Sequence, residues 1–137
     1  MEEDYRFKFN GLGREPPADP NGPDSYRPGD WLAEMYYANP SRFADRIWVP
    51  LDSRTTASPT GQTDYAFYRH GGWSWAVPYL VGIYALGLQV DPDLTPERFY
   101  QAALETGSYT EFEHAGRTYH LGPIINPPAL IERFKSS

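Results

Sequence analysis

The sequence contains no cysteine, and this absence excludes three kinds of site at once. A disulfide framework, a zinc site built on thiolates and a cysteine nucleophile all need the missing side chain. A basic run is missing too: 12 Lys and Arg stand against 18 Asp and Glu, which gives a formal net charge of −6. Nucleic-acid backbones and anionic membranes bind clustered Lys and Arg, so we expect neither as a partner.

A long uninterrupted hydrophobic run is also lacking. The most apolar stretch, residues 75–90, is broken by Pro78, Gly82, Gly87 and Gln89, and it is shorter than the about 20 residues that a membrane-spanning helix needs. The acidic start Met-Glu-Glu-Asp-Tyr is typical neither of a secretory signal nor of a cationic transit peptide. The sequence therefore leaves the localisation unknown.

Proline and aromatic residues are abundant instead. Proline occupies 14 of the 137 positions, about twice its average share, so we expect many loops. Four Trp, 11 Tyr and 7 Phe supply more aromatic bulk than a disordered acidic segment carries, so the chain should still fold. A chain of this length forms one compact domain at most. We divide it into a loop-rich, short-helical segment, residues 1–46, and a main part, residues 47–137.

The first part and the start of the second predict short elements. Residues 10–30 are dense in Gly, Pro, Asn and Asp, which favours a surface loop. Helical spacing of apolar residues predicts two short helices within residues 31–44, broken at Asn39-Pro40. Residues 47–49 and 65–68 read as strands, and the hydroxyl-rich residues 52–63 between them as a loop.

The second half predicts a buried central helix followed by smaller elements. Residues 71–90 are nearly all apolar, and a helix that is hydrophobic all round lies in a protein interior. This helix should begin near Ser74, because Pro78 is tolerated only about one turn in. The next helix should have Thr95 as its N-cap, Pro96 at its first position and Gly107 at its C-terminal end. A hairpin should follow, with strands at residues 110–114 and 117–121 and a turn at Ala115-Gly116. A last helix, residues 129–134, should follow the N-cap Asn126.

Ser74 is the residue whose chemistry is open to two interpretations. A serine at a helix start is most often a plain N-cap. The same position also suits a nucleophile, because a helix N-terminus presents N–H groups and a positive dipole end to the oxyanion that forms on a carbonyl.

The segment around Ser74 resembles the nucleophile motif of the subtilisin-like serine peptidases, the subtilase family. In that family Gly-Thr-Ser-Met-Ala-x-Pro-His opens a buried central helix. Gly72, Ser74, Ala76 and Pro78 match the motif, and Gly82 matches the glycine one turn further on. The resemblance implies a serine endopeptidase that acts on a peptide or protein substrate, with Ser74 as nucleophile and as backbone donor to the oxyanion.

The flanking segments resemble the same family over residues 47–134. Val49-Pro50 is similar to the strand that ends in Ala-Pro-Gly, and residues 90–107 are similar to the turn and helix that follow the central helix. The tail, residues 121–134, is similar to the closing Gly-x-(Ile/Val)-(Asn/Asp) segment and last helix. The fold implied is α/β: the C-terminal portion of a mainly parallel sheet with a buried central helix that starts at the nucleophile.

The sequence departs from the family at two levels. Trp73, Trp75 and Tyr79 replace the usual Thr, Met and His, which alters the substrate pocket but leaves the nucleophile. The triad order in subtilisin is Asp, His, Ser, and no Asp or His motif precedes Ser74 here. His70 does not fit the family pattern.

The remaining polar candidates are weaker. His114 and His120 fall in the predicted hairpin and are interpreted as surface residues. Asn10 is a weak candidate for the oxyanion asparagine. Such a hydrolase needs no cofactor, and no cluster of oxygen ligands can be assigned to a metal.

Without a base, a serine hydroxyl is a poor nucleophile, so we expect this chain alone to be nearly inactive. The simplest hypothesis makes the missing N-terminal part of the catalytic domain its partner. Two alternatives remain: a non-catalytic relic or partner-binding module that keeps the C-terminal lobe, and an unrelated small α+β domain in which Ser74 is a plain N-cap.

Overall fold

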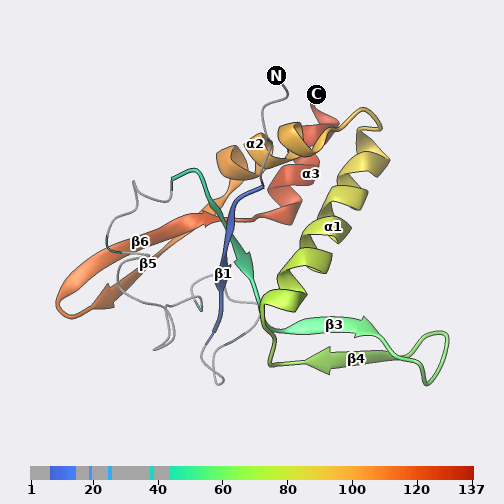
Figure 1. Ribbon diagram of the computed structural model, residues 1–137, viewed down its shortest axis with the longest axis horizontal. Coiled ribbons are helices and arrows are strands. Elements are labelled where there is room, and N and C mark those ends of the chain that lie inside the picture. The colour runs from blue at the N-terminus through green and yellow to red at the C-terminus, as the bar shows by residue number, and fades with distance from the viewer. Residues whose placement is uncertain (1–6, 15–18, 20–24, 26–37, 39–43) are drawn as a thin grey trace.

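A computed structural model describes residues 7–14, 19, 25, 38 and 44–137 and shows a mixed α/β arrangement (Figure 1). The elements are, in chain order, β1 (Phe9–Leu12), β2 (Ile47–Pro50), β3 (Arg54–Ala57), β4 (Tyr65–Tyr68), α1 (Trp73–Val90), α2 (Pro96–Thr106), β5 (Ser108–His114), β6 (Arg117–Ile124) and α3 (Pro127–Lys135). The helices predicted within residues 31–44 and most of the loop predicted for residues 10–30 lie outside the described residues.

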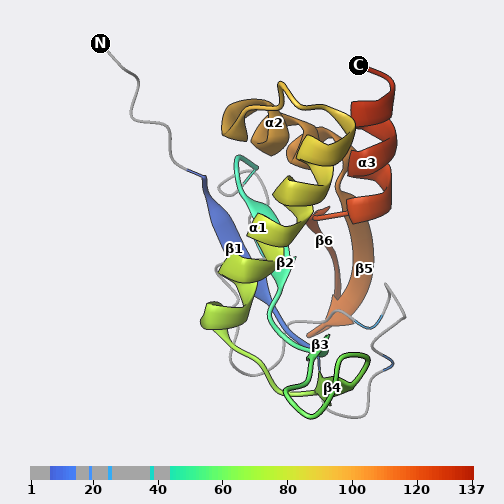
Figure 2. The same cartoon turned by 90° about the vertical axis from the view of Figure 1, so that its right-hand side faces the viewer.

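A four-stranded sheet has the order β1-β2-β6-β5. β1, β2 and β6 run parallel, and β5 pairs antiparallel with β6. Figure 2 shows β1 and β2 side by side with α1 in front of them. The prediction of a mainly parallel sheet in an α/β fold is therefore confirmed. A separate antiparallel hairpin, β3–β4, leads from the end of β2 to the start of α1.

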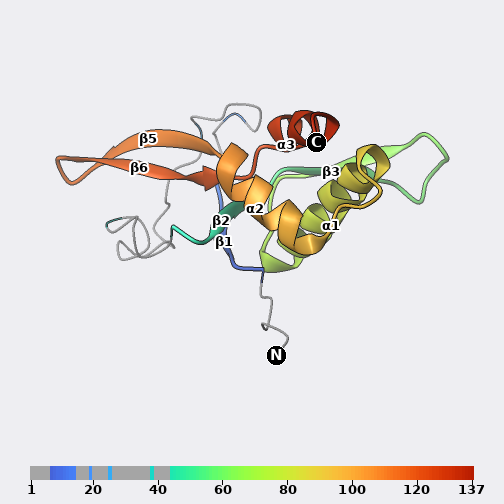
Figure 3. The ribbon, with the colours of Figure 1, turned by 90° about the horizontal axis from the view of Figure 1, so that it is seen from above.

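The helices pack together against one face of the sheet, on the same side in Figure 3. Ile47 and Val49 of β2 face this side and contact the main core. The core also contains the buried residues of the three helices, among them Ala76, Leu80, Ile83, Ala103, Leu130 and Phe134. The opposite face carries a second apolar cluster: Leu12, Trp48, Phe112, Tyr119, Leu121 and Ile124. Alternation along β2 produces the two clusters, since successive side chains of a strand point to opposite faces.

Local capping signals located the later elements correctly. The Thr95 side chain accepts a 3.2 Å hydrogen bond from the Arg98 N–H, and Asn126 accepts one of 3.2 Å from the Ala129 N–H. Both residues are the N-caps that the sequence predicts. The hairpin turn at Ala115-Gly116, where both φ angles are positive, is also confirmed.

Two short strands were wrongly predicted as loop. β1 lies at the start of the Gly- and Pro-rich stretch, and β3 lies inside the hydroxyl-rich residues 52–63. Each has only four residues, and each is held by pairing with a strand elsewhere in the chain rather than by local propensity.

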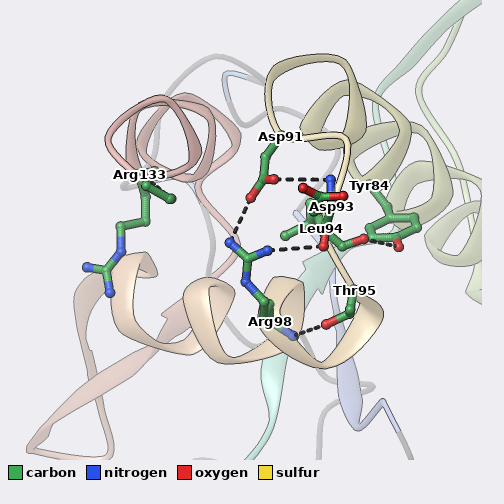
Figure 4. Close-up of polar contacts among 8 residues, drawn as sticks. Tyr84, Asp91, Asp93, Leu94, Thr95, Arg98 and Arg133 are labelled. Atoms are coloured by element: carbon green, nitrogen blue, oxygen red, sulfur yellow. Dashed lines mark hydrogen bonds and ion pairs between the residues drawn. The ribbon is translucent and has the colours of Figure 1, made fainter.

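A hydrogen-bonded junction fixes the angle between α1 and α2 (Figure 4). The Tyr84 hydroxyl donates to the Leu94 carbonyl at 2.7 Å. The Arg98 guanidinium bonds both the Asp91 carboxylate, at 2.7 Å, and the Asp93 carbonyl, at 3.1 Å. The C-terminal end of α1 is therefore tied to the first turn of α2.

The prediction that α1 is buried on all sides is wrong. Only one side, with Ala76, Leu80, Ile83 and Gly87, packs into the core. The other side is exposed at Trp73, Ser74, Val77, Pro78, Val81, Gly82, Ala85, Leu86, Gln89 and Val90, and we call these residues the outer stripe. No described element covers that side. Within the part of the chain that the structure describes, no helix has the length and apolar character needed to cross a membrane.

The two glycines of α1 that face opposite ways give a matched test of this packing. A Cβ at Gly82 meets open space, whereas one at Gly87 lies 2.7 Å from Leu94 Cδ2. Gly82→Ala should raise the free energy of unfolding by about 0.5–1 kcal/mol, because alanine has the higher helix propensity. Gly87→Ala should lower it by about 1 kcal/mol through overpacking. Urea denaturation measures both, and equal effects would contradict the assigned faces.

Candidate functional site

The N-terminus of α1 is placed directly beside the end of β2. The Gly72 N–H donates a 3.0 Å hydrogen bond to the Leu51 carbonyl, just after the strand. A Cβ at Gly71 would lie 1.6 Å from that carbonyl oxygen. Only glycine allows the chain to pass so close, so this contact fixes where the helix begins.

Ser74 occupies the second position of α1, and its side chain is exposed. The N-cap is Gly72, and no side chain makes a capping hydrogen bond. The interpretation of Ser74 as a plain N-cap is therefore wrong. The Ser74 N–H belongs to the first turn, where backbone donors have no acceptor one turn back in the helix. The hydroxyl and the backbone N–H of Ser74 therefore both lie at the N-terminus of an 18-residue helix, which is the positive end of the helix dipole.

The two tryptophans that flank Ser74 anchor this first turn. The Trp73 ring packs on Phe9 of β1 with the ring centroids 5.7 Å apart, and the Trp75 ring packs on Tyr68 of β4 at 5.4 Å. One contact reaches the sheet and the other reaches the hairpin. The two tryptophans therefore hold Ser74 between the sheet and the hairpin.

A pocket of about 330 Å³ lies beside the helix start, at the carboxyl ends of β1 and β2. Its wall includes Arg14, Asp52, His70 and Trp73. The Arg14 guanidinium and the Asp52 carboxylate form a 2.9 Å ion pair, with only 6% and 13% of their side chains exposed. The Arg14 N–H also donates to Asp52 at 2.6 Å, so two bonds join the ends of the two strands.

Arg54 connects the end of β2 to Tyr79 of α1. Its guanidinium donates to the carbonyl of Pro50 and, at 2.6 Å, to that of Asp52. The same group stacks over the Tyr79 ring, 4.2 Å from the centroid. Burial raises the pKa of the Tyr79 phenol, and the positive charges of Arg54 and Arg14 partly oppose that shift.

Sequence reasoning missed Arg14, Asp52 and Arg54. The ion pair joins residues 38 positions apart, and no local motif indicates that they meet.

None of the three histidines forms a hydrogen bond with Ser74 within the described residues. His114 and His120 lie on the β5–β6 hairpin and are exposed, and His120 pairs with Glu111 at 3.3 Å. His70 is exposed and lines the pocket, four residues before Ser74. Within the described residues the Ser74 hydroxyl has no hydrogen-bonded base.

Asn10 does not support its weak assignment to the oxyanion hole. It is 6% exposed and lies in register with Trp48, whose side chain belongs to the cluster on the face opposite α1. Its side-chain oxygen accepts a 3.4 Å hydrogen bond from Arg46. An asparagine on that face cannot reach a carbonyl held at Ser74.

A metal site is not evident in the described part of the chain. No group of three or more His, Asp or Glu residues there could hold an ion. Comparisons of the sequence with protein-family models and with curated proteins, and of the fold with solved structures, found no match. Function must therefore be argued from the site itself.

Paired glycine variants test the placement of the helix start. Gly71→Ala should lower the free energy of unfolding by more than about 3 kcal/mol, because the new methyl group collides with backbone. Gly72→Ala should change it by less than about 0.5 kcal/mol, since a Cβ there meets nothing and the backbone is extended. Chemical denaturation measures both, and a tolerated Gly71→Ala would show that α1 begins elsewhere.

The raised pKa of Tyr79 predicts a loss of stability in alkali. Below the ordinary tyrosine pKa of 10.0 the phenol is neutral in both states and contributes nothing to pH dependence. As the pH rises above that value, the unfolded chain releases its proton first, so stability falls until the folded pKa is passed. Tyr79→Phe should remove this part of the decline. Urea unfolding from about pH 8 to 11 measures it, and parallel curves for parent and variant would contradict the assignment.

Proposed function

We propose that this chain is the C-terminal part of a subtilisin-like serine endopeptidase domain, with Ser74 as the nucleophile. The observation that carries the proposal is the exposed hydroxyl of Ser74, which lies on the first turn of a long helix and makes no capping hydrogen bond. That turn lies at the carboxyl ends of two parallel strands, the usual place for ligands in an open α/β sheet. The matched motif residues Gly72, Ala76 and Pro78 support the same assignment.

The reaction follows from this geometry together with a base from outside the chain. Ser74 Oγ forms a bond to the peptide carbonyl carbon while its proton passes to a histidine imidazole. The Ser74 N–H stabilises the oxyanion that develops. The imidazolium then returns the proton to the leaving amine as the C–N bond breaks. Water hydrolyses the acyl-enzyme by the same base, releases the new carboxyl end and restores the hydroxyl.

The missing N-terminal part of the domain is the partner that this mechanism requires. It would supply the histidine and the aspartate that orients it, because no described residue bonds the Ser74 hydroxyl. The outer stripe of α1, which no described element covers, supports such a partner, since Ser74 lies within that stripe. The substrate class is a peptide or protein.

A non-catalytic relic or partner-binding module is the second candidate. The bulky residues Trp73, Trp75 and Tyr79 favour it, because they replace the usual Thr, Met and His beside the nucleophile and so alter the substrate pocket. In this candidate the chain still binds a partner, but Ser74 catalyses no reaction.

Labelling with a fluorophosphonate separates the candidates. Joined to the polypeptide encoded in frame upstream of Met1, the chain should be labelled at Ser74 at least about 100-fold faster than alone, because general-base assistance is worth that factor or more. Peptide mass spectrometry identifies the site, with Ser74→Ala as the negative control and the exposed Ser136 as the reference serine.

The other outcomes are decisive as well. An upstream sequence that lacks both the Asp and the His motif overturns the peptidase proposal. Equal labelling of Ser74 with and without the upstream polypeptide contradicts the claim that a base from outside the chain activates Ser74. Rapid labelling of the isolated chain also excludes the second candidate, the non-catalytic relic.

A further inference from the structure

The pocket beside the start of α1 is rich in cationic side chains, although the chain as a whole is acidic. Among the described residues of its wall, the charged and ionisable ones are Arg14, Arg69, His70 and Asp52. Two guanidinium groups therefore stand against one carboxylate, in a chain whose formal net charge is −6. A cleft lined mainly by one sign of charge concentrates ligands of the opposite sign, so this wall favours an anionic group.

The one carboxylate of this wall is engaged by Arg14. Asp52 Oδ1 accepts a 2.9 Å bond from the Arg14 guanidinium, and Asp52 Oδ2 accepts a 2.6 Å bond from the Arg14 backbone N–H. Arg69 then adds a second guanidinium to the wall and no further carboxylate. A guanidinium carries five N–H donors, so it can bind an anion even when other donors of the same group have partners.

The pocket has room for a side chain of a bound peptide. Its volume is about 330 Å³, which lies at the lower end of the range of small-molecule sites, about 300–1,000 Å³. Gly13 and Gly72 contribute backbone alone to the wall, and a Cβ at Gly72 would meet nothing within 4 Å. Leu51 and Trp73 also line the pocket and offer apolar contacts to methylene groups.

The pocket lies beside the nucleophile. Trp73 belongs to the wall, and Ser74 is the next residue in the chain. Consecutive Cα atoms are about 3.8 Å apart, and an extended peptide advances about 3.3–3.6 Å per residue. A peptide whose carbonyl group lies at Ser74 therefore places a residue one or two positions away within reach of this wall.

We propose that this pocket binds the carboxylate of an acidic side chain of the peptide substrate, one or two residues from the bond that Ser74 cleaves. The inference rests on the proposed function and adds a substrate preference to it. Arg69 is the principal donor, because Arg14 already binds Asp52 and, at 2.7 Å, the Ser25 hydroxyl. The planar guanidinium fork matches a carboxylate through two parallel hydrogen bonds.

Other occupants fit the wall less well. A basic side chain would meet the like charges of two arginines. An amide side chain of the same shape could accept hydrogen bonds, but bonds between a charged donor and a charged acceptor are about twice as strong as neutral ones. A nucleic-acid backbone would be repelled by the net charge of −6 outside the pocket.

Three blocked peptides test the pocket on the 137-residue chain itself. They share the sequence acetyl-Ala-Ala-X-Ala-amide, where X is Asp, Asn or Lys. Two-dimensional NMR of the nitrogen-labelled chain follows the amide signals of Gly71 and Gly72, which both line the pocket. The Asp peptide should shift these signals and bind at least about tenfold more tightly than the Asn peptide, because a charge-assisted pair replaces a neutral one. The Lys peptide should leave them unmoved.

Arginine variants locate the donor. Arg69→Gln should weaken binding of the Asp peptide at least about tenfold, and Arg69→Lys should weaken it less, because lysine keeps the charge. The matched control Arg117→Gln, at an exposed position of the β5–β6 hairpin, should change it less than about twofold. Circular dichroism checks that each variant is folded, and the comparison of Asp with Asn peptides needs no variant at all.

Four results overturn the proposal: equal binding of the Asp and Asn peptides, binding that leaves Gly71 and Gly72 unshifted, equal affinity for inorganic phosphate, or equal affinity for acetyl-tetraalanine with a free terminal carboxylate. The outcome is separable from that for catalysis, because binding needs no base. Asp-selective binding without labelling of Ser74 rejects the peptidase activity and supports the carboxylate pocket. Labelling of Ser74 without Asp-selective binding rejects the pocket alone.

Discussion

The close contact between Gly71 and the Leu51 carbonyl is the constraint on which the site depends. It leaves no room for a side chain, and the neighbouring Gly72 N–H bonds the same oxygen. The start of α1 is thereby tied to the end of β2. Ser74 lies two residues after Gly72, so a backbone contact rather than a side-chain cap determines where the Ser74 hydroxyl lies.

Buried polar groups at the ends of β1 and β2 surround that contact. The Arg14–Asp52 pair joins the ends of β1 and β2, and Arg54 joins the same loop to Tyr79 of α1. A buried ion pair adds little net stability after its desolvation cost, but removal of one partner is strongly destabilising. We infer that these groups fix one arrangement of strand ends and helix start.

Sequence reasoning succeeded where the signal is local. The caps Thr95 and Asn126 and the turn at Ala115-Gly116 act within a few residues, and each was predicted at its position. The start of α1 near Ser74 followed from the place of Pro78 in the helix. These features depend on backbone hydrogen bonds that the residue type itself determines.

The failures share a different cause. β1 was missed because its pairing partner, β2, lies more than 30 residues away, and the Arg14–Asp52 pair was missed for the same reason. The burial of α1 was overestimated because hydrophobicity indicates that a surface prefers to be covered, and only tertiary structure shows what covers it. The outer stripe is the part of the apolar surface of α1 that no described element covers.

The central claim is that Ser74 receives its base from another part of the same domain. A crystal structure of this chain together with the polypeptide encoded upstream tests it most directly. The account predicts an imidazole nitrogen of that polypeptide about 2.6–3.2 Å from Ser74 Oγ. An assembled structure in which Ser74 Oγ faces solvent, or in which another element covers it without a base, would contradict the account.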